Sequence, residues 1–164
     1  MSADIDTLVH TLIERHLSVA TAESLTGGAL CARLVDVPGA SETVRGGVCT
    51  YATELKAQVL GVDPGRLART GPVDREVALQ MARGVRRLMG ADVGLSTTGV
   101  AGPGPADGHP AGTVHLACVT PAGERHRELH LTGDRAEIRA GSVQAALDLL
   151  ARALDLDGGP LGAD

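Results

Sequence analysis

The sequence predicts an α/β fold, with a mixed, mostly parallel sheet of about five strands covered by helices on both faces. Two observations lead to this prediction. Short apolar runs that are typical of buried strands alternate with longer segments whose apolar residues recur at helical spacing. The chain of 164 residues is also 43% hydrophobic, which suits one domain with a substantial core. We therefore expect a single domain over residues 1–164, with a frayed tail from about residue 155.

The first half of the chain is predicted to alternate helices with two strands. Apolar residues from Ile5 onward recur at helical spacing, which predicts an amphipathic first helix. Thr53 has the residue type of a helix N-cap, and Gly61 that of a helix stop. The expected elements are a helix over 5–16, a strand over 17–22, a helix over 26–37, a strand over 46–51 and a helix over 54–60, with 41–45 left open as helix or loop.

The second half is predicted to contain a long helix, a central strand, a hairpin and a final helix. Asp74 is a typical N-cap, and Val77, Met81 and Val85 share one face of the helix that follows. The expected elements are a short segment from residue 64, a helix over 75–89, a largely apolar strand over 91–98, an antiparallel hairpin of strands 113–120 and 125–132, and a helix from 134 to about 154.

A long loop over 97–112, with five glycines and three prolines, follows the predicted central strand. Loops of this length at the end of a buried strand are more often functional than incidental. In α/β sheets, ligands collect where strands end and helices begin. Three groups of candidate residues are predicted to reach such ends, namely Ser24, Tyr51 with Lys56, and Thr98 with its glycine loop.

Composition argues against several classes of function. The net charge of −5 and the absence of long basic runs disfavour binding to nucleic acid or to a membrane surface. Tyr51 is the only Phe, Trp or Tyr, so stacking platforms for bases are missing. No apolar stretch approaches the ~20 residues that span a bilayer, and the first residues lack the features of a signal peptide. We therefore expect a cytoplasmic protein.

The cysteines and histidines do not have the spacing of a disulfide framework or a metal site. Cys31, Cys49 and Cys118 are odd in number, widely separated and in apolar contexts, so we expect buried thiols. Only His126 and His130 have a spacing that puts two rings on one face of a strand, and we expect the outer face. Dinucleotide-binding and P-loop patterns are absent too. The sequence therefore predicts no metal and no cofactor.

Ser24 is placed as a nucleophile would be, on the bend of the sequence TAESLTGG between a strand and a helix. Gly27 and Gly28 lie in the expected first turn of that helix. Amide groups there have no partner within the helix and lie at the positive end of its dipole, so they can hold an oxyanion. The alternative is that Ser24 is a helix cap and the glycines only allow close packing. Glu23 has either a substrate-binding or a structural role.

Lys56 is the only lysine, whereas the other fourteen basic residues are arginines. Arginine stays protonated, so it cannot replace lysine as a base that must lose its proton. The field at a helix start, together with burial, would lower the pKa of Lys56 and leave a neutral amine. Tyr51 could then bridge this amine and the Ser24 hydroxyl. The residues predict a Ser–Lys dyad with a tyrosine partner.

Arg135 and Arg139 lie one helical turn apart at the start of the last predicted helix. Two guanidinium groups beside a helix N-terminus suit a phosphate. The alternative is a solvated charged face on which the two arginines pair with Glu137 or Asp134.

Five blocks of sequence follow one another along the chain. They are TAESLTGG at 21–28, GGVCTYATELK at 46–56, TGVAGP at 98–103, GTV at 112–114 and GDRAEIR at 133–139. In this order they resemble the blocks of the CinA C-terminal-domain family. The resemblance extends over residues 5–154 and implies a three-layer α/β/α fold in a stand-alone form, without the larger N-terminal domain that some relatives carry. A homodimer is expected at the level of the family.

The resemblance implies a nicotinamide-nucleotide amidohydrolase of pyridine nucleotide salvage. Such an enzyme converts nicotinamide mononucleotide and water into nicotinic acid mononucleotide and ammonia, without a metal. By position, Ser24 corresponds to the nucleophile, Lys56 to its base, Tyr51 to the tyrosine partner and Thr98 to a threonine on the substrate side. The residues implied to bind substrate are Gly27, Gly28, Gly99, Arg135 and Arg139.

The chain departs from the family pattern at three places. Ala52-Thr53 stands where Ser-Asn is common, Leu25 replaces a common cysteine, and the loop over 105–110 lacks the usual Gly-Gly-Thr-Pro. The dyad residues are intact. An amidase for a different small carboxamide, or a nucleotide-binding regulatory module without catalysis, is therefore the alternative to the deamidase.

Overall fold

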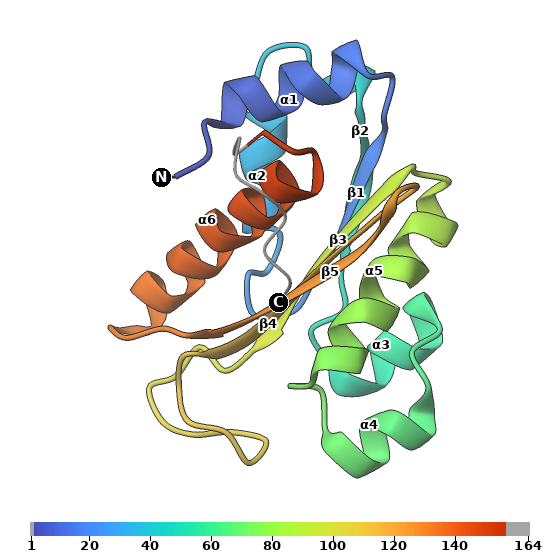
Figure 1. The fold of residues 1–164 in the computed structure, drawn as a ribbon. Helices are drawn as coiled ribbons and strands as arrows, with labels where there is room; N and C mark the ends of the chain where they lie inside the picture. Colours follow the sequence, from blue (N-terminus) through green and yellow to red (C-terminus); the bar gives the residue numbers. More distant parts are fainter. Residues whose placement is uncertain (1, 157–164) are drawn as a thin grey trace.

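The computed structural model describes residues 2–156 and places a five-stranded sheet between two layers of helices (Figure 1). Most of the tail expected from residue 155 lies outside the described residues. The helices are α1 Ile5–Glu14, α2 Ala29–Val35, the 3₁₀ helix η1 Ala40–Glu42, α3 Thr53–Leu60, α4 Pro64–Thr70, α5 Arg75–Met89 and α6 Arg135–Ala153, and the strands are β1 Val19–Glu23, β2 Val44–Cys49, β3 Val93–Gly99, β4 Thr113–Thr120 and β5 Gly123–His130.

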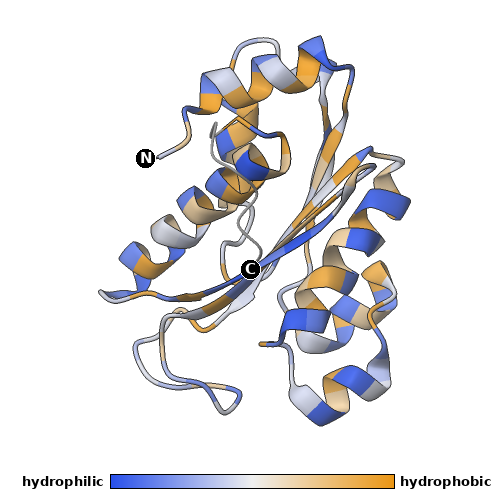
Figure 2. Cartoon of the chain, viewed as in Figure 1, coloured by the Kyte–Doolittle hydropathy of each residue, from blue (hydrophilic) through white to orange (hydrophobic). Residues whose placement is uncertain are grey.

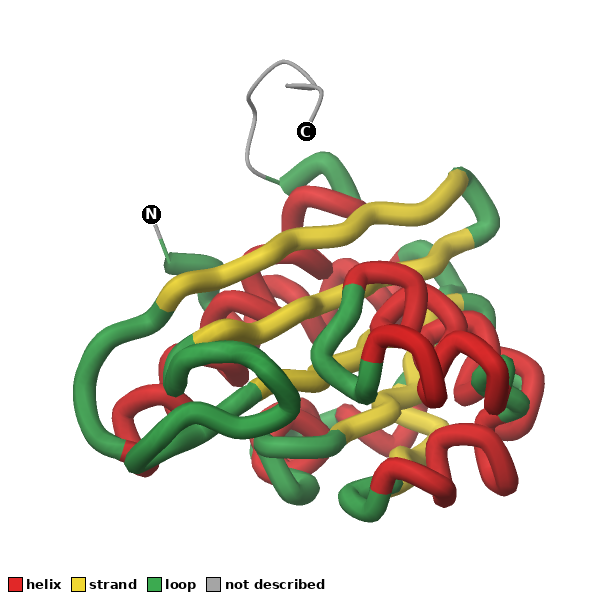
Figure 3. Tube along the Cα trace, turned by 90° about the horizontal axis from the view of Figure 1, so that it is seen from below, coloured by secondary structure: helices red, strands yellow, loops and turns green. Residues whose placement is uncertain are grey.

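The strand order β2-β1-β3-β4-β5 confirms the predicted mixed sheet. The pairs β1–β2 and β1–β3 are parallel, whereas β3–β4 and β4–β5 are antiparallel, so β4 alone among the described strands runs against the others. Because β2, β1 and β3 run in the same direction, the segments that follow them meet at one edge of the sheet. Figure 3 shows the molecule from this end, where loops gather.

Helices cover both faces of the sheet, as predicted. Helices α1, α2 and α6 lie on one side, and α3, α4 and α5 lie on the other (Figure 1). Apolar and hydrophilic positions alternate around these helices, as expected when each packs one side on the sheet (Figure 2). Leu12, Leu116 and Leu147 belong to the larger core on the α6 side, and Met81 and Val85 to a smaller one beneath α5.

Several helix and strand boundaries in the segments around Ser24 and Lys56 differ from the predicted ones. The helix expected over 26–37 begins only at Ala29, because the residues after Ser24 form a turn. Segment 41–45 contains the end of η1 and the start of β2, which extends over Val44–Cys49. Thr53 is the first residue of α3 rather than its cap. Asp74 is the N-cap of α5 as predicted, since its carboxylate accepts from the amides of Glu76 and Val77.

Two predictions about side-chain burial are wrong. Only Cys118 is buried, whereas Cys31 is partly exposed and Cys49 is exposed, since β2 is an edge strand. His126 does not face outward, because its Nε2 lies 2.9 Å from Nδ1 of the buried His115 on β4. Burial, together with the neighbouring ring, lowers the pKa of His126 to about 4.

The length and apolar character of the helices can be compared with those of a membrane-spanning helix. Within the described part of the chain, the structure contains no helix that is both long and apolar enough to cross a membrane.

The close packing of α5 on β3 depends on Gly94. A Cβ atom at this position would overlap the carbonyl oxygen of Ala82 and lie 3.1 Å from the Cβ of Arg86. We expect Gly94→Ala to lower the free energy of unfolding by about 3 kcal/mol, because α5 must move away from the sheet. Gly104→Ala is the control, since a Cβ there meets nothing within 4 Å. Equal midpoints for the two variants in urea unfolding would contradict this packing argument.

Candidate active site

A cavity of about 460 Å³ opens at the edge of the sheet where β1 and β3 end. This size suits a small-molecule ligand. Of the nine predicted site residues, six line the cavity: Ser24, Tyr51, Lys56, Thr98, Gly99 and Arg135. Gly27, Gly28 and Arg139 do not line it.

Ser24 and Lys56 meet at the wall of this cavity. Ser24 follows β1, and its amide donates to the carbonyl of Thr97 on β3 at 3.1 Å, which fixes the bend. Lys56 comes from the first turns of α3, and its Nζ lies 2.9 Å from Ser24 Oγ. Both residues are buried, with 7% of Ser24 and 1% of Lys56 exposed. The structure therefore brings together two residues that are 32 positions apart in the chain.

The surroundings of Lys56 favour a neutral amine. Burial lowers its pKa from 10.5 to about 8, against the opposing influence of the Asp107 and Glu54 carboxylates. Its Nζ also donates to the carbonyls of Thr50 at 2.7 Å and Tyr51 at 3.4 Å. A neutral amine has two hydrogens and one lone pair. In the neutral form, an amine that donates both hydrogens to these carbonyls has its lone pair left to accept the proton of the Ser24 hydroxyl.

The side chain of Tyr51 does not bridge the amine and the serine, so this part of the prediction is wrong. The residue is 63% exposed, and its hydroxyl accepts a hydrogen bond from Arg135 Nη2 at 3.2 Å. Tyr51 contacts Lys56 only through its backbone carbonyl. Its ring still lines the cavity.

The carboxylate of Glu23 binds the amides at the N-terminus of α2, which were expected to hold an oxyanion. Only 1% of this residue is exposed. Its Oε1 accepts from the Thr26 hydroxyl at 2.6 Å and from the amides of Gly28 at 3.2 Å and Leu30 at 2.9 Å, and its Oε2 accepts from Cys31 N at 3.0 Å. A carboxylate at this position is stabilised by the helix dipole. The role of Glu23 is therefore structural, and Gly28 is not an oxyanion donor.

Arg139 and Gly27 likewise shape the turn after Ser24. Arg139 Nε donates to the carbonyl of Leu25 at 2.8 Å, and its Nη2 donates to that of Thr26 at 3.1 Å. Gly27 has φ +60°, a left-handed conformation that favours glycine, and its amide donates to the carbonyl of Ser24. The backbone conformation of the turn thus explains this glycine, and the two predicted roles, oxyanion donor for Gly27 and phosphate ligand for Arg139, are not supported.

The Arg135–Arg139 pair does not form the charged face considered as an alternative either. Asp134 and Glu137 instead form a capping box at the start of α6. Arg135 Nη1 donates to the carbonyl of Gly102 at 2.6 Å, which ties α6 to the loop that follows β3. Arg135 is therefore the arginine of the pair that lines the cavity.

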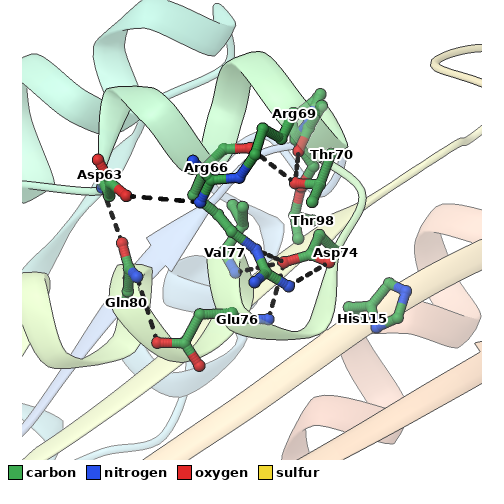
Figure 4. A network of polar contacts seen from close by, with 12 residues as sticks. Asp63, Arg66, Arg69, Thr70, Asp74, Glu76, Val77, Gln80, Thr98 and His115 are labelled. Carbon is green, nitrogen blue, oxygen red and sulfur yellow. Dashed lines mark hydrogen bonds and ion pairs between the residues drawn. The ribbon is translucent and has the colours of Figure 1, made fainter.

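Thr98 is buried beneath the cavity and already uses its hydroxyl hydrogen. Its Oγ1 donates to the carbonyl of Pro72 at 2.7 Å, just before α5. Figure 4 shows Thr98 beside the corner between α4 and α5, where Arg66 pairs with both oxygens of Asp74 at 2.9 Å. The hydroxyl of the threonine expected on the substrate side thus donates to the protein backbone instead. A Cβ at Gly99 would lie 2.6 Å from the carbonyl oxygen of Thr113, so close packing requires this glycine.

Sequence reasoning missed two features of the cavity. Leu25, directly after the serine, lines it, and among the described residues the amide of Leu25 has no hydrogen-bond acceptor. The amide after a nucleophile is a common oxyanion donor. Asp107 also lines the cavity, from the long loop over 97–112, in which only Thr98 and Gly99 had been chosen as site residues. The Asp-Gly pair at 107–108 is the turn signal that could have identified it.

Metal sites in proteins are usually built from several His, Cys, Asp or Glu side chains that lie close together. Between residues 2 and 156, His, Cys, Asp and Glu side chains form no group of three or more that could hold a metal ion.

Comparison with known sequences identifies relatives over nearly the whole chain. The model of the CinA C-terminal domain family matches residues 3–154. A CinA-like protein from Frankia casuarinae is 52% identical over 143 residues, which cover 87% of this chain and 33% of that protein. A putative competence-damage inducible protein from Desulforamulus reducens is 47% identical over 138 residues, covering 84% and 34% respectively. The chain thus spans about a third of the length of these curated relatives.

Solved structures show the same fold over most of their length. A competence-damaged protein (CinA) superfamily protein from Klebsiella pneumoniae has a TM-score of 0.87 and 33% identity, and the match covers 94% of this chain and 99% of that one. A competence/damage inducible protein from Agrobacterium tumefaciens has a TM-score of 0.84 and 38% identity, with 93% and 96% covered.

Proposed function

The chain belongs to the CinA C-terminal domain family, and from this premise we propose that it is an amidohydrolase that deamidates nicotinamide mononucleotide. The observation that carries the proposal is the contact of 2.9 Å between the buried Lys56 amine and the Ser24 hydroxyl at the wall of a cavity. An amine whose pKa is lowered toward neutrality, next to a serine on a sharp bend, is suited to nucleophilic catalysis without a histidine.

In the proposed reaction, neutral Lys56 takes the proton of Ser24 Oγ as this oxygen attacks the carboxamide carbon. The carbonyl oxygen becomes an oxyanion, which the Leu25 amide stabilises. When the intermediate collapses, the C–N bond breaks and Lys56 returns its proton to the departing nitrogen, which leaves as ammonia. Water then attacks the ester on Ser24 and gives a proton to Lys56. The bond between the acyl carbon and Ser24 Oγ breaks, Lys56 returns the proton to Oγ, and nicotinic acid mononucleotide is released.

Ammonia release from nicotinamide mononucleotide tests this proposal directly. We expect the purified protein to form ammonia and nicotinic acid mononucleotide in equal amounts, with or without a chelator, and Ser24→Ala to form neither. Loss of turnover on adding chelator would contradict metal-free catalysis, and full activity of Ser24→Ala would contradict the nucleophile. Binding without ammonia release would indicate a regulatory module. Turnover of other carboxamides alone, with or without a phosphate, would indicate a different amidase.

We also propose that the chain acts as one domain, in the cytoplasm and as a homodimer. Light scattering on the purified protein tests the dimer, and a monomer at all accessible concentrations would contradict it.

The two arginines of α6 are expected to affect different kinetic constants. Arg135 lines the cavity, so Arg135→Ala should raise KM for nicotinamide mononucleotide about tenfold through loss of a phosphate contact. Arg139 holds the turn after Ser24, so Arg139→Ala should lower kcat about tenfold or more with little change in KM. Steady-state kinetics distinguish the two effects. Nicotinamide riboside is the control, because without a phosphate its KM should respond much less to Arg135→Ala than that of the nucleotide does.

A further inference from the structure

Asp107 is the one carboxylate among the described residues that line the cavity. The other charged side chains on this lining are Lys56 and Arg135. Within residues 2–156, Asp107 makes no hydrogen bond or ion pair through its side chain. An exposed carboxylate that makes no hydrogen bond or ion pair remains available to contact a charged group of a ligand in the cavity.

A tight turn holds Asp107 at this position. The amide of Ala106 donates to the carbonyl of His109 at 3.0 Å, and the amide of His109 donates to the carbonyl of Ala106 at 2.9 Å. Between them, Asp107 and Gly108 have φ values of +51° and +79°, as in a type I′ turn, for which Asp-Gly is a favoured pair. The carboxylate is therefore presented by a backbone that is formed before any ligand binds.

We propose that Asp107, together with the ring of Tyr51, selects a substrate whose aromatic ring carries a positive charge, an N-alkylated pyridinium carboxamide rather than an uncharged amide. This inference rests on the proposed function. A carboxylate attracts such a cation, and the face of an aromatic ring attracts it as well. Tyr51 lines the same cavity, and its hydroxyl is held by Arg135. Arg135 in turn provides a positive charge for a phosphate.

The charge on the substrate also acts on the base. Asp107, from the loop after β3, and Glu54, on α3 itself, both raise the pKa of Lys56 and so oppose its neutral form. A cationic ring beside Asp107 offsets that influence and disfavours the ammonium form of Lys56. The acid limb of kcat should therefore lie at lower pH than the acid limb of kcat/KM. Asp107→Asn should move the limb of kcat/KM to lower pH.

The experiment compares nicotinamide mononucleotide with its reduced form, whose dihydropyridine ring is uncharged. Asp107→Asn keeps the side-chain shape and tolerates the left-handed backbone, and we expect it to raise KM for the cationic nucleotide about fivefold. KM for the reduced nucleotide should stay unchanged. Asp107→Glu should retain the preference for the cation. Asp6→Asn, which removes the same charge from α1 at the opposite end of the molecule, should behave as the wild type.

Binding measured by calorimetry with both nucleotides separates this inference from the amidase proposal. If neither nucleotide is hydrolysed, the amidase proposal fails, and a binding preference for the cation that Asp107→Asn removes would still support the role of Asp107. If the protein hydrolyses the nucleotide but Asp107→Asn affects both ring forms equally or neither, the selection by charge is wrong while the amidase stands. Failure to bind either nucleotide would overturn both.

Discussion

Replacement of Lys56 by methionine is expected to lower kcat for amide hydrolysis by about a thousandfold or more, because no other base contacts Ser24. Methionine fills a similar volume without an amine. Among the described residues, only Lys56 Nζ forms a side-chain hydrogen bond with Ser24 Oγ. Ammonia release measured under saturating substrate gives kcat for the variant directly. Lys56→Arg should be equally inactive, because a guanidinium does not give up its proton in this pH range.

The pH dependence of the wild type gives a second measurement on the same residue. The pKa of Lys56 is lowered to about 8 by burial, so kcat/KM should rise with pH through an acid limb near that value. Because the folded state disfavours the charged amine, Lys56 lowers the free energy of unfolding at pH values below its folded pKa of about 8. This loss of stability decreases as the pH rises and vanishes near the ordinary pKa of 10.5. At pH 7 the free energy of unfolding of Lys56→Met should therefore be at least as large as that of the wild type. An inactive variant that is also unfolded by circular dichroism would contradict this reasoning.

Several local signals in the sequence predicted the ends of helices correctly. Asp74 caps α5, and Gly61 ends α3 in the left-handed conformation, both as predicted. The single lysine among arginines also singled out Lys56 before its surroundings were known. In that case the chemistry of the residue type, rather than the pattern around it, pointed to a contact with Ser24 across 32 positions of the chain.

The predictions that failed depend on which groups compete for the same partner in the folded chain. The amide of Gly28 would have no hydrogen-bond partner in an isolated helix. In the folded chain it donates to the carboxylate of Glu23, five residues earlier. The position of Arg139 in the sequence predicts a phosphate ligand, but in the structure its guanidinium donates to the carbonyls of Leu25 and Thr26, in the turn after Ser24. Similarly, Cys49 has an apolar context but lies on an edge strand, and strand order is not contained in a local pattern. Tertiary contacts of this kind decide which polar groups remain available to a substrate.

Replacement of Glu23 by alanine is expected to lower the free energy of unfolding by about 3–5 kcal/mol. The carboxylate is almost completely buried and accepts from the amides of Gly28, Leu30 and Cys31 and from the hydroxyl of Thr26. Removing it leaves these donors, two of them buried and two partly buried, without an acceptor at a helix N-terminus, where the dipole favours a negative charge. Urea unfolding followed by circular dichroism measures the loss.

Two further variants separate the charge of Glu23 from its volume. Glu23→Gln keeps the shape, but its amide group replaces one acceptor oxygen by a donor that faces other donors, so it should recover only part of the stability. Thr21→Val removes a single long bond of 3.4 Å to the same carboxylate and should cost less than about 1 kcal/mol. Because Glu23 directly precedes Ser24, loss of the cap should also lower kcat at temperatures where the protein stays folded. A variant Glu23→Ala as stable as Thr21→Val would show that solvent replaces the cap, and the rigid placement of the serine would then need another origin.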